Sequence, residues 1–116
     1  MIEELIAKVF AAREAAHLEH WRTKSYAQHQ ALGEFYDTII DQIDELVECY
    51  QGNFGLIGDV KLVPAEGNVL SLLSKDVGWI AKNRTKIAGG VDALENIIDT
   101  LSATYLRTIY KLENLS

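Results

Sequence analysis

The sequence predicts an all-α protein, a four-helix bundle with one long crossover between its second and third helices. Apolar residues recur at steps of three and four in four separate stretches, and no stretch alternates clearly in the period of a strand. Between the two middle stretches, residues 52–67 carry four glycines and the only proline. A connection of about 16 residues at ~3.3 Å each can return along a ~30 Å helix. The same pattern permits a plain up-and-down bundle with a generous loop.

The first two helices have clear stripes and ends. The first is expected at 2–22, and His20 falls in its apolar stripe. The second is expected at 26–51, where Ser25, with a glutamine three residues on, matches a capping box. Gly52 is suited to a left-handed C-cap at its end. The stripe of the first helix is Ile2, Leu5, Ile6, Val9, Ala12 and Ala16, and that of the second is Leu32, Phe35, Tyr36, Ile39, Ile43, Leu46 and Tyr50.

The second half of the chain repeats this pattern. Asn68 can cap a third helix at 69–88, and a reversal at Gly89-Gly90 leads into a fourth helix at 91–114. Within the preceding connection, we expect a short extended strand at Asp59–Val63. The third stripe is Leu70, Leu73, Val77, Ile80, Arg84 and Ile87, and the fourth is Val91, Leu94, Ile97, Ile98, Leu101, Tyr105, Ile109 and Leu112.

Composition narrows the classes of protein that the chain can represent. Its 116 residues suit a single domain, 1–116, and 48% hydrophobic against 24% charged residues describe a folded protein. Cys49 is the only cysteine, which excludes an internal disulfide and favours a reducing, cytoplasmic location. No apolar run approaches the roughly 20 residues that span a bilayer, so we expect no membrane contact. A net charge of -6 disfavours nucleic acid as a direct partner.

Imidazole and carboxylate side chains gather in the first half of the chain. All three histidines lie within 17–29, and Asp37, Asp41, Asp44 and Glu48 form one ladder beside the apolar stripe of the second helix. Asp44 and Glu48, nearest the core edge, are either metal ligands or part of a solvated helix face, and solvation is favoured for Asp37 and Asp41.

The first helix adds a second set of candidate ligands. Glu14, His17 and His20 follow at three-residue steps, the Glu-x-x-His spacing with which bundle metalloproteins place a carboxylate and an imidazole on one ion. The alternative interpretation of a histidine on an apolar stripe is a hydrogen-bonded core residue. Trp21 is expected to anchor the core or an interface.

The spacing of these residues resembles a known family. The pair His20-Trp21, followed by His29, Tyr36, Asp44 and Glu48, is similar to the signature of the Dps group of the ferritin superfamily. In that signature, a tyrosine, an aspartate and a glutamate follow the second histidine after seven, fifteen and nineteen residues, as they do here after His29. The resemblance covers about residues 14–51, a third of the chain. The family also has ferritin-like connectivity with one long crossover.

In that family, two histidines of one subunit and an aspartate and a glutamate of its two-fold partner form a ferroxidase site, which oxidises Fe(II) with peroxide or oxygen inside a twelve-subunit shell. The resemblance implies that His20 and His29 bind iron, or another divalent metal, together with Asp44 and Glu48 of a second chain. Trp21 and Tyr36 would then lie at the interface of at least a homodimer.

One spacing and two positions differ from the family pattern. The gap between His20 and His29 is shorter, Gly33 replaces an acidic residue, and Cys49 replaces an arginine. The chain also lacks the short crossover helix and the lysine-rich tail of that family. The segments YAQHQALGEFYD and ECYQG look like parts of small uncharacterised proteins that tailed phages encode.

Two other functions stay open. One is a non-catalytic helical interaction protein that uses Trp21, Tyr26, Tyr36 and Trp79 only for packing and contacts. The other is a nucleotide pyrophosphohydrolase of the MazG kind, in which the motif from Asp44 to Glu48 and the later acids Asp92, Glu95 and Asp99 would hold Mg²⁺ against phosphates. The candidate enzyme activities are therefore ferroxidase and pyrophosphohydrolase.

Overall fold

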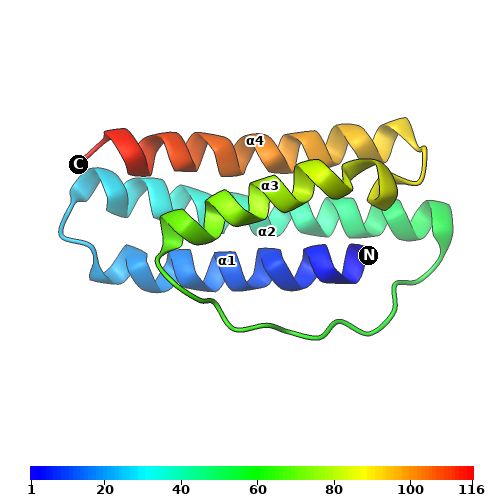
Figure 1. Cartoon of the computed structure of the whole chain (residues 1–116), viewed down its shortest axis with the longest axis horizontal. Coiled ribbons are helices and arrows are strands. Elements are labelled where there is room, and N and C mark those ends of the chain that lie inside the picture. Colours follow the sequence, from blue (N-terminus) through cyan, green and yellow to red (C-terminus); the bar gives the residue numbers. More distant parts are fainter.

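The computed structural model describes residues 1–116 and contains four helices and no strand (Figure 1). The helices are α1 (Ile2–Arg22), α2 (Tyr26–Phe54), α3 (Val69–Ala88) and α4 (Asp92–Asn114). Neighbouring pairs are α1 with α2, α2 with α4, α4 with α3, and α3 with α1, so the four helices enclose one core. The predicted all-α four-helix bundle is confirmed. None of the helices is long and apolar enough to span a bilayer.

The connection between α2 and α3 is a true crossover. Residues 55–68 leave the end of α2, pass outside α1 and reach the opposite end of the bundle, so that α2 and α3 run in the same direction (Figure 1). The expectation of a strand at Asp59–Val63 was wrong, because this segment is extended but no second extended segment lies beside it. The backbone N–H of Gly58 instead donates to the Glu3 carboxylate of α1 at 2.8 Å.

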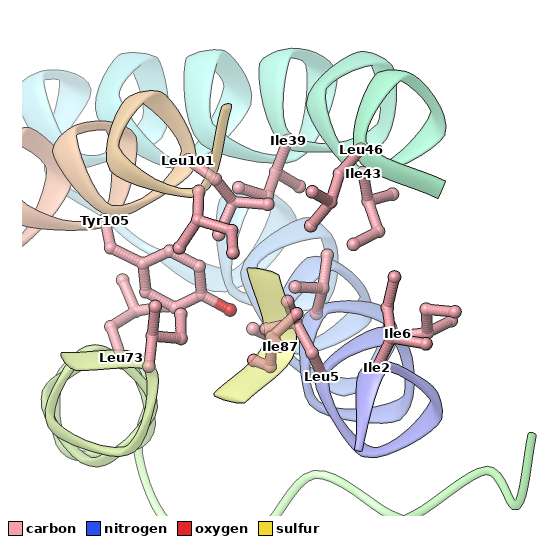
Figure 2. Close-up of a cluster of buried hydrophobic side chains, with 14 of the residues drawn as sticks. Ile2, Leu5, Ile6, Ile39, Ile43, Leu46, Leu73, Ile87, Leu101 and Tyr105 are labelled. Atoms are coloured by element: carbon pink, nitrogen blue, oxygen red, sulfur yellow. The ribbon is translucent and has the colours of Figure 1, made fainter. Parts of the chain in front are cut away.

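The apolar stripes of all four helices meet in one buried cluster (Figure 2). Burying a leucine or isoleucine side chain stabilises a fold by roughly 1.5–3 kcal/mol, so this cluster is the main source of stability. Its largest fully buried members include Phe35, Ile39, Leu46, Leu73, Ile80, Leu101 and Tyr105.

Two predicted helix ends are confirmed in detail and one is wrong. Asn68 Oδ1 accepts a hydrogen bond from the Ser71 backbone at 2.8 Å, and Gly89 and Gly90 both have positive φ in the α3–α4 turn. However, α2 passes through Gly52 and ends at Phe54, with Gly55 as its C-cap at a φ of 94°. The added turn places the Phe54 ring 4.9 Å from that of Tyr50 and against Gly89, a tertiary contact that prolongs the helix.

The predicted capping box is only half formed. Ser25 Oγ accepts from the Gln28 backbone N–H at 3.2 Å, as expected. The Gln28 side chain does not return to Ser25, because its amide donates to the Leu112 carbonyl of α4 at 3.5 Å. The start of α2 is thereby tied to the end of α4.

The core also holds a polar pair that the periodicity does not reveal. Asp76 of α3 is 3% exposed, and its carboxylate accepts a hydrogen bond of 3.0 Å from the hydroxyl of the fully buried Tyr105. Burial raises the pKa of Asp76 to about 6, although the hydrogen bond from Tyr105 and the charge of Lys8 oppose the shift. Burial likewise raises the pKa of Tyr105 well above its ordinary value.

Candidate functional site

All three histidines lie in one aromatic cluster where α1 ends and α2 begins. The His20 ring stacks on that of His29 with centroids 3.7 Å apart, and His17 stacks on Tyr36 at 4.0 Å. Trp21 lies against His17 at 4.5 Å but remains 67% exposed, whereas the three histidines are half-buried. The structure therefore brings together the histidines that the sequence singled out.

His20 and His29 are locked to each other by two reciprocal hydrogen bonds. Nδ1 of His20 donates to the His29 carbonyl at 2.6 Å, and Nδ1 of His29 donates to the His20 carbonyl at 2.7 Å. Since a carbonyl oxygen only accepts, both Nδ1 atoms must carry the proton. A neutral ring then has a free lone pair on Nε2. Metal-binding histidines are commonly held in this way, with the second ring nitrogen donating to a backbone carbonyl.

Gly33 makes this packing possible. A Cβ atom at Gly33 would lie 3.1 Å from Cε1 and 3.2 Å from Nδ1 of His20. The imidazole therefore rests directly on the backbone of α2, where no larger residue fits without displacing it.

The stack limits how the two rings can bind metal. Their planes are inclined by only 16°, and a metal ion lies in the plane of the imidazole that binds it. Two nearly parallel rings 3.7 Å apart cannot both direct a lone pair at one ion in this conformation. In this conformation each ring can therefore offer its Nε2 only to an ion of its own.

The two predicted acidic ligands lie far from the histidines of the same chain. Asp44 and Glu48 follow His29 by fifteen and nineteen residues, which is about 22–28 Å along α2. Both are exposed, and neither forms an ion pair. Within one chain, no three histidine, cysteine, aspartate or glutamate side chains converge on a possible metal position. The predicted site needs the acids of a second chain and stays a prediction.

Asp44 and Glu48 stand at the edge of an apolar groove. The groove has a volume of about 360 Å³ and lies between α1 and α2, beside the start of the crossover. Sequence reasoning did not identify it, because two of its lining residues come from the crossover. Its apolar lining is Ile6, Phe10, Ile43, Val47, Ile57 and Val60.

The remaining candidate ligands take other positions. Glu14, Asp37 and Asp41 are exposed, and the His17 ring is covered on one side by Tyr36. His17 lies beside the His20–His29 stack, with its centroid 6.4 Å from that of His20. Glu14 and His17 thus remain secondary candidates at the rim of the cluster.

The carboxylates of the pyrophosphohydrolase interpretation are separated. Arg84 of α3 donates two hydrogen bonds to Asp99 at 2.6 and 2.8 Å and one to Glu95 at 3.1 Å. This guanidinium lowers the pKa of Asp99, mainly through its hydrogen bonds. These acids join α3 to α4, whereas Asp44 lines the groove with α1. One chain therefore does not assemble both acidic groups around a single magnesium position.

Comparison with known proteins gives a family but no activity. No curated protein and no solved structure matches the chain. A family model described as DUF5856, a family of unknown function, matches residues 20–112. This range includes the His20–His29 pair and the two predicted acidic ligands. The chain therefore belongs to the DUF5856 family of unknown function.

Proposed function

We propose that the protein is a Dps-like, metal-binding homodimer or larger homo-oligomer of the cytoplasm, which takes up Fe(II) and supports its oxidation. Each dimer has two equivalent sites. A site consists of His20 and His29 from one copy, with each imidazole binding an ion of its own, and of Asp44 and Glu48 from the other. Iron is the first candidate metal, because imidazole nitrogen together with carboxylate oxygen suits Fe(II), manganese and zinc.

The observation that supports this proposal is the reciprocal pair of hydrogen bonds between His20 and His29. It fixes both rings, and in their neutral form it places the free lone pair on Nε2 of each. The unpaired charges of Asp44 and Glu48 supply the anionic half of the site, since exposed acids one turn apart repel each other and gain from a cation.

Anaerobic Fe(II) titration followed by oxygen or peroxide tests the proposal. Wild-type protein should bind Fe(II) and then develop ferric absorbance, and the variant His29→Ala should lose most of this signal. Asp44→Asn leaves the histidine stack intact and should weaken Fe(II) binding by roughly 10-fold or more, as loss of a metal-site residue typically does. Asp37→Asn is the matched control, an exposed acid on the same helix outside the proposed site. Equal binding by all four proteins would overturn the proposal.

A non-catalytic helical interaction protein is the second candidate, and one observation favours it. The stacked pairs His20–His29 and His17–Tyr36 fill the junction of α1 and α2 as ordinary packing would. Under this alternative, Fe(II) has no effect, and His29→Ala changes only stability. Thermal unfolding with and without Fe(II) separates the two functions, because a ligand that binds only the folded state raises Tm.

A further inference from the structure

We propose that a cavity at one end of the bundle binds an apolar α-amino acid, whose ammonium pairs with Glu19 and whose carboxylate pairs with Arg22. The cavity has a volume of about 390 Å³ and lies between the end of α1 and the start of α3, where the crossover returns to the bundle (Figure 1). Pockets for small ligands typically measure about 300–1,000 Å³, so this one suits a small molecule. The inference goes beyond the proposed metal site and does not depend on it.

All four helices contribute to this cavity. One wall consists of residues from the last two turns of α1, and the facing wall consists of residues 65–70, where the crossover ends and α3 begins. Leu32 of α2 is fully buried and lies at the inner end of the cavity, beside Leu112 of α4. The amide of Gln28 donates to the Leu112 carbonyl at 3.5 Å, which ties α2 to α4 at this point. The cavity is therefore part of the folded bundle rather than a gap in a loop.

Most of the lining is apolar and incompletely covered. Seven of the twelve lining residues are hydrophobic, so most of the surface of a fitting ligand must be apolar as well. Leu18 at the mouth is 47% exposed, and Leu70 and Leu112 are only half-buried. A branched aliphatic side chain placed between these leucines would remove apolar surface from water on both sides, which favours binding.

Two opposite charges lie together on the α1 wall. Glu19 and Arg22 are three residues apart, so their side chains lie on the same side of the helix. They are the only charged residues of the lining, and neither takes part in an ion pair. Glu19 is half-buried, so part of its surface is already withdrawn from water. Each charge is therefore able to accept a partner from a ligand.

These charges select the class of ligand. A ligand with only a carboxylate is repelled by Glu19, and a ligand with only an amine is repelled by Arg22. A zwitterion pairs with both, through charge-assisted hydrogen bonds to the carboxylate and to the planar guanidinium. An α-amino acid carries its two charges on one carbon atom, as close together as one turn of α1 requires, and an aliphatic side chain on that carbon would reach the leucines. Leucine and amino acids of similar shape fit this description.

Isothermal titration calorimetry with L-leucine, on the whole chain in EDTA, tests the proposal without any variant. L-Leucine should bind. N-Acetyl-L-leucine lacks the ammonium and L-leucinamide lacks the carboxylate, so each should bind roughly 10-fold or more weakly, because one charge of the protein loses its partner. Glycine keeps both charges but has no side chain, and it should also bind more weakly than L-leucine.

Variants of the two charged residues assign each contact. Glu19→Gln should weaken L-leucine binding roughly 10-fold but cause no loss for N-acetyl-L-leucine, which has no ammonium to lose. Arg22→Gln should do the same for L-leucine and L-leucinamide. A variant that only disturbed the structure would weaken all three ligands alike. Glu4→Gln is the matched control, because Glu4 is an exposed acid of α1 outside the cavity.

Filling the cavity gives an independent readout. Ala65 is exposed in the crossover and lines the cavity, so Ala65→Phe should abolish L-leucine binding without changing either charge. L-Leucine should also raise the Tm of the wild type, and this rise should be absent in Ala65→Phe. The absence of both heat and a Tm rise with millimolar L-leucine would overturn the proposal, and so would equal binding of L-leucine and its two analogues. Fe(II) titration is a separate measurement, so the amino-acid site and the proposed metal site can fail independently.

Discussion

Two backbone carbonyls determine where His20 and His29 carry their protons. Because each carbonyl accepts from Nδ1, we expect both rings in their neutral form to be Nδ1–H tautomers. Long-range ¹H–¹⁵N NMR correlations distinguish the two tautomers. His17 has no such hydrogen bond and serves as the internal comparison. An Nε2–H tautomer at both positions would contradict the arrangement, because it would remove the lone pairs proposed for metal binding.

The buried carboxyl of Asp76 should make stability depend on pH. Its pKa is raised by burial from 3.8 to about 6, so the folded protein binds this proton more tightly than the unfolded chain. The free energy of unfolding therefore falls as pH rises through this interval, and the loss is complete above the folded pKa. We expect roughly 1–1.5 kcal/mol of this loss between pH 5 and pH 8, and Asp76→Asn should abolish it.

Urea unfolding of the wild type and of Asp76→Asn at pH 5 and pH 8 measures this loss of stability. The carboxamide introduced by Asp76→Asn would still offer an oxygen to the Tyr105 hydroxyl, so the variant removes the titration and keeps the hydrogen-bond acceptor. Asp37→Asn, at an exposed position, controls for the change in net charge. A stability difference between wild type and Asp76→Asn that is the same at pH 5 and pH 8 would show that Asp76 does not titrate in this range.

At the scale of helices, two glycines of α3 and its following turn should respond oppositely to alanine. Gly89 has φ of 58°, and a Cβ atom there would lie 2.8 Å from Cζ of Phe54. Gly78 lies within α3 with nothing within 4 Å of a Cβ position. Gly89→Ala should destabilise by about 1–2 kcal/mol or more, whereas Gly78→Ala should stabilise by up to about 1 kcal/mol. Thermal unfolding of both variants checks the opposite signs, and equal shifts would contradict this explanation.

The periodicity of the apolar residues predicts the four helices. It fails where a tertiary contact determines a helix end or the burial of a polar residue. All four apolar stripes are recognisable, because each helix buries one side in the same core. The end of α2 was misplaced, since Gly52 is a plausible stop and only the packing of Phe54 against Gly89 carries the helix on to Gly55. Asp76 was missed for a similar reason: a buried carboxyl is unexpected until Tyr105, 29 residues later, is known to donate to it.

At the scale of the whole molecule, the sequence identifies the candidate ligands but not their arrangement. The family resemblance implies that His20 and His29 contribute to one metal site. It contains no information on the ring stack, the reciprocal hydrogen bonds or the fit of the His20 ring on Gly33. The distance from these rings to Asp44 also follows from helix geometry, and it shows why a single chain cannot complete the predicted site.

Mixing two inactive variants tests whether a site is shared between chains. One variant lacks the imidazoles, as His20→Ala with His29→Ala, and the other lacks the acids, as Asp44→Asn with Glu48→Gln. Neither should bind Fe(II) alone. In a mixed dimer, one site loses both halves, while the other combines the histidines of the second variant with the acids of the first and is intact. Random exchange of equal amounts should restore about a quarter of the wild-type sites, because half of the dimers are mixed and each has one complete site.

Fe(II) titration before and after the chains are mixed, unfolded and refolded together measures this recovery. A mixture of Asp37→Asn with the imidazole-free variant is the control: it should have about half of the wild-type sites before and after exchange, because the acids are intact in both chains and half of the chains carry the histidines. A site formed within one chain would show no recovery of Fe(II) binding on mixing, because each variant chain lacks half of the ligands. No recovery, although the variants form mixed dimers, would contradict a shared site. Recovery near a quarter is expected only if each site takes its histidines from one chain and its acids from the other.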